Sequence, residues 1–179
     1  MNQAFAIVVF ASVDDSGADG PDCGSPLPRQ AVAELARIAV PLVLVSGSAA
    51  PHVRRVQRHL RIEEPFVCDG GGAVHVPPSW RATASDIEDG RWERFQFNPP
   101  DRSAAVTLVR DLFVARRHDV LTVGIGCDLD DYGVLAAVDV PVVVRDPLRD
   151  QRELLRHVPG AYLTTATGVD GWLEALIGP

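Results

Sequence analysis

Short apolar runs alternate with segments of helical periodicity along most of the chain. Runs rich in Val, Ile and Leu, such as 5–13, 42–45 and 120–125, are typical of strands buried on both faces. Between them, apolar residues recur at helical spacing, as in 28–40 and 102–116. The same patterns predict further strands at 66–68, 73–76, 140–144 and 161–164, and helices near 53–60 and at 131–137, 150–157 and 170–177. Strands that alternate with helices predict an α/β fold: a three-layer, doubly wound, mostly parallel sheet.

One segment, 77–100, breaks this alternation. It holds Trp80, Trp92, Phe95 and Phe97 among Pro, Gly and Asp residues, and it is too short to bury a core of its own. We therefore interpret 1–179 as a single domain with a short insert. The aromatic side chains of the insert are expected to cover the edge of the sheet, or to bind a protein partner or a second copy of the chain.

Four predicted loops come at the ends of predicted strands. They lie at 12–17, 46–48, 69–72 and 127–131. In open α/β sheets, ligands bind at the carboxyl ends of the strands. The binding site is therefore expected where these loops meet.

Composition excludes several classes of function. The chain has 179 residues and a net charge of −7, which argues against nucleic acid and anionic membranes as partners. All 17 basic residues are Arg, so no mechanism that needs a Lys ammonium or a Schiff base applies. Cys23, Cys68 and Cys127 form no C-x-x-C pair and predict neither a disulfide framework nor a zinc site. Because we see neither a signal-peptide pattern nor a membrane-spanning apolar run, we expect a cytoplasmic protein.

Six short segments place polar or glycine residues where strands end or helices begin. They read F-A-S-V-D-D at 10–15, V-L-V-S-G-S at 43–48, P-F-V-C-D-G-G at 65–71, D-R-S at 101–103, G-I-G-C-D-L-D-D at 124–131 and G-V-D-G-W at 168–172. In order and spacing they resemble the motifs of haloacid-dehalogenase-type (HAD) phosphatases, and most closely the mannosyl-3-phosphoglycerate phosphatase branch. The last segment, similar to that branch's G-P-x-G-W, is the most specific. The resemblance implies a HAD-like Rossmannoid core with a truncated cap at 77–100.

The resemblance also assigns catalytic positions. Ser12 stands where the family has its nucleophilic Asp, and Asp14 keeps the general-acid position two residues later. Arg102 replaces the family's Lys and could still grip a phosphate. In a second register, the looser D-x-[ST]-G form of the motif, Asp14 would be the nucleophile and Ser16 would occupy the acid position.

The phosphate-binding motif of the family is retained. Its Ser or Thr hydroxyl and the following amides hold the phosphoryl group. Ser46, Gly47 and Ser48 match it, 34 residues after Ser12. These residues equally fit a plain helix cap.

The metal-binding motif is altered. Cys127 stands at the first acid of the family's G-D-x-x-N-D loop, whereas the second acid, Asp131, remains. Together with Asp14 and Asp128 it could attract Mg²⁺ loosely, although a thiol and a neutral serine are poor ligands for this ion. Taken alone, acids at a helix start also fit capping and compensation of the helix dipole.

These substitutions predict a function. HAD chemistry needs a carboxylate that attacks phosphorus and a metal that neutralises charge. A chain that has lost the nucleophile and a metal acid is expected to be non-catalytic and to bind a phosphorylated small molecule or a partner protein. The alternative is an active Mg²⁺-dependent phosphomonoesterase with Asp14 as its phosphoaspartyl nucleophile.

Overall fold

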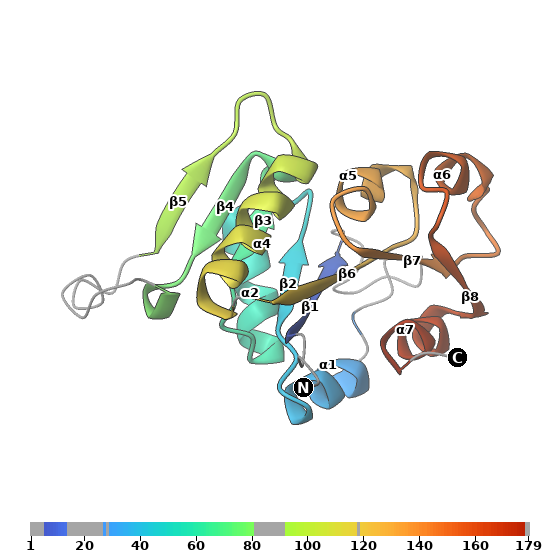
Figure 1. Ribbon diagram of the computed structural model, residues 1–179, viewed down its shortest axis with the longest axis horizontal. Coiled ribbons are helices and arrows are strands. Elements are labelled where there is room, and N and C mark those ends of the chain that lie inside the picture. The colour runs from blue at the N-terminus through green and yellow to red at the C-terminus, as the bar shows by residue number, and fades with distance from the viewer. Residues whose placement is uncertain (1–5, 14–26, 28, 81–91, 118, 178–179) are drawn as a thin grey trace.

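The computed structural model describes residues 6–13, 27, 29–80, 92–117 and 119–177 (Figure 1). Its strands are β1 (Ala6–Ser12), β2 (Leu42–Val45), β3 (Phe66–Cys68), β4 (Ala73–Val76), β5 (Glu93–Gln96), β6 (Val120–Gly126), β7 (Val140–Arg145) and β8 (Tyr162–Thr167). Its α-helices are α1 (Arg29–Arg37), α2 (Ala50–Leu60), α4 (Arg102–Arg117), α5 (Tyr132–Leu135), α6 (Arg152–His157) and α7 (Gly168–Ile177). Short 3-10 turns are η2 (Asp69–Gly71), η3 (Pro78–Trp80) and η4 (Leu129–Asp131).

The described strands form one sheet of eight strands in the order β5-β4-β3-β2-β1-β6-β7-β8. All neighbouring pairs from β3 to β8 in this order are parallel, whereas β3–β4 and β4–β5 are antiparallel. The chain thus starts in the middle of the sheet and winds outward in both directions. The predicted doubly wound, mostly parallel sheet is confirmed.

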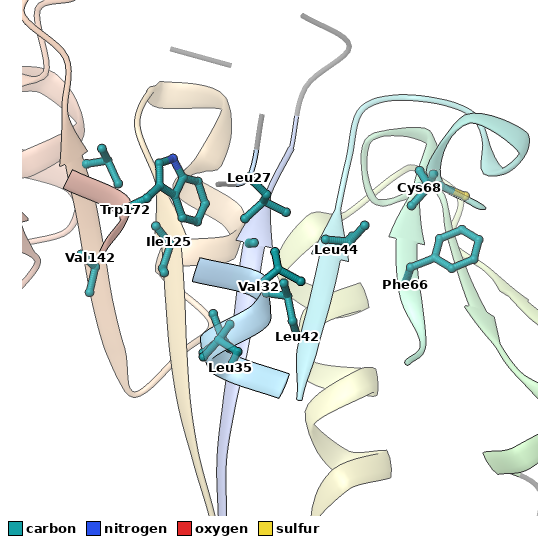
Figure 2. Close-up of a cluster of buried hydrophobic side chains, with 14 of the residues drawn as sticks. Leu27, Val32, Leu35, Leu42, Leu44, Phe66, Cys68, Ile125, Val142 and Trp172 are labelled. Atoms are coloured by element: carbon teal, nitrogen blue, oxygen red, sulfur yellow. The ribbon is translucent and has the colours of Figure 1, made fainter. Parts of the chain in front are cut away.

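Helices cover both faces of the sheet, so the fold has three layers. On one face, α1, α2 and α7 pack on the sheet through side chains such as Leu35, Val53 and Trp172 (Figure 2). On the other, α4 and α5 contribute Phe113 and Val134, with α6 packed at the β7 end. Fully buried aliphatic and aromatic side chains contribute about 1.5–3 kcal/mol each, so these two cores hold the sheet in place.

The C-terminal helix α7 is fixed to β8 through Glu174. Its carboxylate accepts hydrogen bonds from the Tyr162 hydroxyl (2.5 Å) and from the amides of Thr165 and Ala166 (both 2.8 Å). These bonds, that of Tyr162 first, lower the pKa of Glu174 to about 2. Gly171 packs so closely on β8 that an added Cβ would lie 2.7 Å from the Ala166 carbonyl oxygen. The G-V-D-G-W segment therefore has a packing role in this fold.

The predicted insert contributes β5 to the edge of the sheet. The Trp80 ring packs edge-to-face against the Phe113 ring, with 4.5 Å between the ring centroids. The centroids of the Trp92 and Phe66 rings lie 5.6 Å apart. The rings at 95 and 97 also pack against the core beneath α4. All four aromatic side chains thus contact their own chain and give no separate reason to expect a partner, although binding of a partner or a second copy stays a prediction.

One predicted helix differs from the structure. Instead of a helix over 131–137, the chain forms the 3-10 turn η4 and then the single turn of α5. A capping box fixes the start of this turn: Asp128 accepts from the backbone of the turn, and the Asp131 side chain accepts from the amide of Asp128. In the described part of the chain, no helix is both long enough and apolar enough to cross a membrane.

Candidate functional site

The sheet register brings three of the predicted loops to one edge. Ser12, the last residue of β1, pairs with Val45, and Ala11 pairs with Ile125. Because these strands are parallel, the residues that follow β2 and β6 emerge beside the end of β1. Ser12, the loop at 46–48 and the loop at 127–131 therefore share the carboxyl edge of the sheet.

Asp131 is the buried acid at the centre of this edge. Its side chain is only 2% exposed, and Oδ2 accepts hydrogen bonds from the amides of Cys127 (2.6 Å) and Asp128 (3.1 Å). The carboxyl group rests on Gly126, where an added Cβ would lie 2.5 Å from the Asp131 Cβ. Glycine is required at 126 because any side chain would displace the acid.

Ser12 lies near the carboxyl group of Asp131. The Ser12 hydroxyl lowers the pKa of Asp131, as a nearby hydrogen-bond donor does. The geometry is not that of a complete hydrogen bond, because Ser12 Oγ and Asp131 Oδ1 are both buried without a hydrogen-bond partner among the described residues. Burial is the largest influence and raises the pKa of Asp131 above its ordinary value, against the bonds from Ser12 and from the Cys127 amide. Ser12 and Asp131, which the motif resemblance pairs as nucleophile position and metal acid, thus lie near each other.

Arg102 begins α4 and points into the same edge. Its Nη1 donates to the Asp130 carbonyl at 2.7 Å and lies 3.6 Å from Asp131 Oδ1. A close backbone approach fixes this helix start: Gly71, with φ of +92°, allows no Cβ, which would lie 2.3 Å from the Arg102 amide nitrogen. The side chain of Arg102 therefore contacts the loop after β6, whereas its backbone packs against the turn after β3.

The loop after β2 lies next to Arg102. Ser46 Oγ accepts from the Ser48 amide at 3.0 Å, and both serines are buried, whereas Gly47 is exposed. A Cβ added at Gly47 would lie 3.5 Å from Arg102 Nη2. The helix-cap interpretation is not the one observed, because α2 is capped by Ala49 without a side-chain hydrogen bond.

A second arginine reaches the acidic loop from the far side. Arg149 Nη1 lies 2.6 Å from Asp128 Oδ2, and its Nε lies 3.3 Å from Asp146 Oδ2. The Gln151 amide nitrogen donates to the carbonyls of Cys127 (2.7 Å) and Val144 (2.8 Å). These contacts join the loop after β7 to the loop after β6.

Sequence reasoning missed Asp146, Arg149 and Gln151. The available signal was position: 146–151 directly follows the strand that neighbours the metal-motif strand, so its polar residues share the same edge.

The cysteines differ from one another and from the sequence prediction. The sulfur of Cys127 is part of a disulfide bond, which the sequence analysis, expecting no disulfide framework, did not predict. Cys68 is a free, buried thiol. Burial, followed by the charge of Asp69, raises the pKa of Cys68 to about 12, which makes it unreactive.

The acidic loop fits Mg²⁺ poorly, although Cys127, Asp128 and Asp131 bring one candidate ligand atom each within 4.8 Å of one another. Mg²⁺ prefers near-octahedral oxygen ligands. A disulfide sulfur is not such a ligand, and the carboxylates of Asp128 and Asp131 already accept hydrogen bonds from their own chain. Asp14, the remaining predicted metal and catalytic residue, and Ser16 lie outside the described residues.

The fold is shared with solved structures. Sucrose-phosphatase from Synechocystis sp. PCC6803, in complex with sucrose and phosphate, has a TM-score of 0.58 at 12% identity, covering 97% of this chain and 98% of that one. A haloacid dehalogenase-like hydrolase from Bacillus subtilis has a TM-score of 0.57 at 13% identity, covering 98% of this chain and 90% of that one. Cobalt-bound deoxy-D-mannose-octulosonate 8-phosphate phosphatase from Haemophilus influenzae has a TM-score of 0.55 at 15% identity, covering 95% of this chain and 84% of that one. The chain thus has the fold of HAD-like phosphatases.

Part of the chain is also similar in sequence to a curated protein. The chain is 32% identical over 78 residues to a glucosyl-3-phosphoglycerate/mannosyl-3-phosphoglycerate phosphatase of Persephonella marina. The matched segment is 42% of this chain and 28% of that protein. No protein-family profile matches the chain. The shared fold and this local sequence similarity agree with the HAD resemblance that the motifs predicted.

Proposed function

We propose that this protein binds a phosphorylated small molecule at the carboxyl edge of its sheet and does not hydrolyse it. The observation that carries the proposal is the contact between Ser12 and Asp131. In the HAD-like motif order, this is where a carboxylate nucleophile and a metal would meet the phosphorus. Here the position holds the neutral hydroxyl of Ser12, which lies near the buried carboxyl group of Asp131.

The retained features support binding of an oxyanion. The exposed Gly47 stands beside the guanidinium of Arg102, and the loop around it is held by the buried Ser46 and Ser48. Backbone amides and a guanidinium together suit a phosphate, since Arg forms paired, charge-assisted hydrogen bonds to it. Phosphate binding therefore needs no group beyond those present.

The missing features argue against turnover. Formation of a phosphoaspartate needs a carboxylate at the attacking position, and Ser12, which the motif resemblance assigns to that position, has none. A metal at this edge would provide charge neutralisation at the phosphoryl group. We expect Mg²⁺ to bind only weakly, because the carboxylates of Asp131 and Asp128 already accept hydrogen bonds from the Cys127 amide and from Arg149.

The test combines binding and turnover on the purified full chain. Inorganic phosphate binding is measured by calorimetry for the wild type, Arg102→Met and a matched control, Arg117→Met, at the exposed far end of the same helix. Loss of a charge-assisted hydrogen bond is expected to weaken binding about tenfold in Arg102→Met only. Equal affinity in all three proteins would contradict a phosphate site at Arg102.

Hydrolysis is assayed in parallel with a generic phosphomonoester and Mg²⁺. The expected rate equals the background rate. Robust Mg²⁺-dependent turnover that is abolished by Asp14→Asn would instead establish the active enzyme with Asp14 as its nucleophile.

Two further expectations accompany this proposal. A protein partner or self-association through 77–100 stays a prediction, to be checked by light scattering of the wild type at high concentration. Cytoplasmic location also stays a prediction. The disulfide at Cys127 is a reason to test it, because disulfides persist mainly in oxidising compartments.

A further inference from the structure

Every carboxylate oxygen of the acidic pair at the site has a neighbour from the protein. Asp128 Oδ1 accepts from the Asp130 amide (3.0 Å), and Asp128 Oδ2 accepts from Arg149 (2.6 Å). Asp131 Oδ2 accepts from two backbone amides, and Oδ1 lies 3.6 Å from Arg102. A cation that binds here would compete with these contacts, above all with the two guanidiniums.

Arg149 is exposed at the surface, but two carboxylates hold its guanidinium in place. Its Nε faces Asp146 while its Nη1 faces Asp128, so one guanidinium bridges two carboxylates. Asp146 is itself held in place, since its Oδ1 accepts from the Leu148 amide (2.9 Å) and its amide donates to Gln151 Oε1 (3.1 Å). The planar fork of Arg keeps both contacts at a fixed geometry.

Charge gives this arrangement a consequence. Relative to the HAD-like motifs, Ser12 and Cys127 remove two negative charges from the edge, which is the charge that a divalent cation would neutralise. Asp131 has the guanidinium of Arg102 beside it, and Asp128 shares the guanidinium of Arg149 with Asp146. Two guanidiniums thus offset part of the charge of these three carboxylates without a metal ion.

We propose that Arg149 and Arg102 replace the divalent cation, so that the site binds its phosphorylated ligand independently of metal. This inference rests on the proposed function. It adds that Arg149 is the residue that keeps metal out, because it occupies the oxygen of Asp128 that a cation would need. Removal of Arg149 should therefore convert a metal-independent site into one that takes up a divalent cation.

The experiment measures two ligands separately. Inorganic phosphate binding is followed by calorimetry in EDTA and in Mg²⁺, and Mn²⁺ binding is followed by electron paramagnetic resonance. The proteins are the wild type, Arg149→Met and the control Arg152→Met, whose side chain is 84% exposed and lies 3.9 Å from Asp150. Denaturation curves confirm that each variant is folded, and the wild-type measurements need no variant.

The expected wild-type result is the same phosphate affinity in EDTA and in Mg²⁺, with no specific Mn²⁺ signal. In Arg149→Met, phosphate affinity in EDTA should fall about tenfold, and a specific Mn²⁺ site should appear. Arg152→Met should behave as the wild type.

The outcomes separate the inference from the function on which it rests. Phosphate binding by the wild type only in Mg²⁺ would overturn the inference and leave the proposed function intact. Absence of phosphate binding in both conditions would overturn the proposed function. Wild-type Mn²⁺ binding as tight as that of Arg149→Met would overturn the role of Arg149, whatever phosphate does.

Discussion

The loop after β2 and the loop after β6 lie at the same edge of the sheet but use their polar groups differently. The first loop leaves Gly47 exposed beside Arg102, and a buried hydrogen bond from the Ser48 amide to Ser46 Oγ fixes its backbone. The second loop turns its acids inward, where Asp128 and Asp131 accept bonds from their own backbone and from Arg149. One loop is open to an incoming oxyanion, and the other has its charge neutralised by the protein. This difference is what the proposed binding of phosphate without a metal ion requires.

The largest expected effect comes from restoring the acids of the second loop. Ser12→Asp combined with Cys127→Asp adds two carboxylates beside Asp131, and metal binding should return before any turnover does. We expect Mn²⁺ affinity to rise at least about tenfold, about 1.4 kcal/mol, in electron paramagnetic resonance titrations.

Its control is the uncharged pair Ser12→Asn with Cys127→Ser, which also removes the sulfur. If the charged pair binds Mn²⁺ no better than the uncharged pair, the missing acids are not what keeps metal out.

A matched pair of alanine substitutions compares the packing of the two loops. An added Cβ at Gly126 would overlap Asp131, at 2.5 Å from its Cβ, whereas one at Gly47 would meet only Arg102 Nη2 at an ordinary 3.5 Å. Gly126→Ala should destabilise the protein by about 1–3 kcal/mol, the usual cost of overpacking. Gly47→Ala should change stability by less than about 0.5 kcal/mol. Urea denaturation measures both, and equal losses would mean that the loops do not differ in this respect.

The buried acid predicts a pH dependence of stability. Burial raises the folded-state pKa of Asp131 above its ordinary value. The stability that it contributes is therefore complete below the unfolded pKa and is lost as pH rises through the folded pKa. Asp131→Asn imitates the neutral acid, so its stability relative to the wild type should increase across this window. Denaturation at a series of pH values checks this, with Asp170→Asn on an exposed position as control.

The opposite trend would also be informative. If Asp131→Asn loses stability relative to the wild type as pH rises, the attraction of Arg102 at 3.6 Å outweighs burial, and the ionised acid is the stable form.

The smallest effect lies away from both loops. Glu174, which joins α7 to β8, has its pKa lowered from 4.5 to about 2, chiefly by the Tyr162 hydroxyl. Its contribution to stability is therefore present above the unfolded pKa and is lost as pH falls through about 2. Glu174→Gln should destabilise the protein at neutral pH, and this difference should shrink in acid. Phosphate affinity should not change, and the exposed Glu153→Gln serves as control.

Much of the sheet was predictable because its strands are buried on both faces and appear as continuous apolar runs. The segments at 42–45, 66–68 and 73–76 coincide with β2, β3 and β4. The strand β5 was not predicted, because Glu93–Gln96 has an exposed, mixed composition typical of an edge. Edge strands owe their place to pairing with a neighbour rather than to their own pattern.

The site was predictable only in part, for a physical reason. Motif spacing places Ser12, Ser46, Arg102 and Asp131 at one edge, because each follows a strand or begins a helix. The neutralisation of Asp128 by Arg149 was not predictable, because a salt bridge across 21 residues depends on how two loops meet. Likewise, the burial that raises the pKa of Asp131 is a tertiary property.

The most direct test of metal-independent phosphate binding is a crystal structure determined in the presence of both inorganic phosphate and Mn²⁺, with anomalous data at the manganese edge. We predict phosphate density beside Gly47 and Arg102, with Arg149 still on Asp128 and no anomalous peak at the acidic pair. A manganese peak at about 2.0–2.5 Å from an oxygen of Asp131, with the phosphate bound to it, would contradict the account.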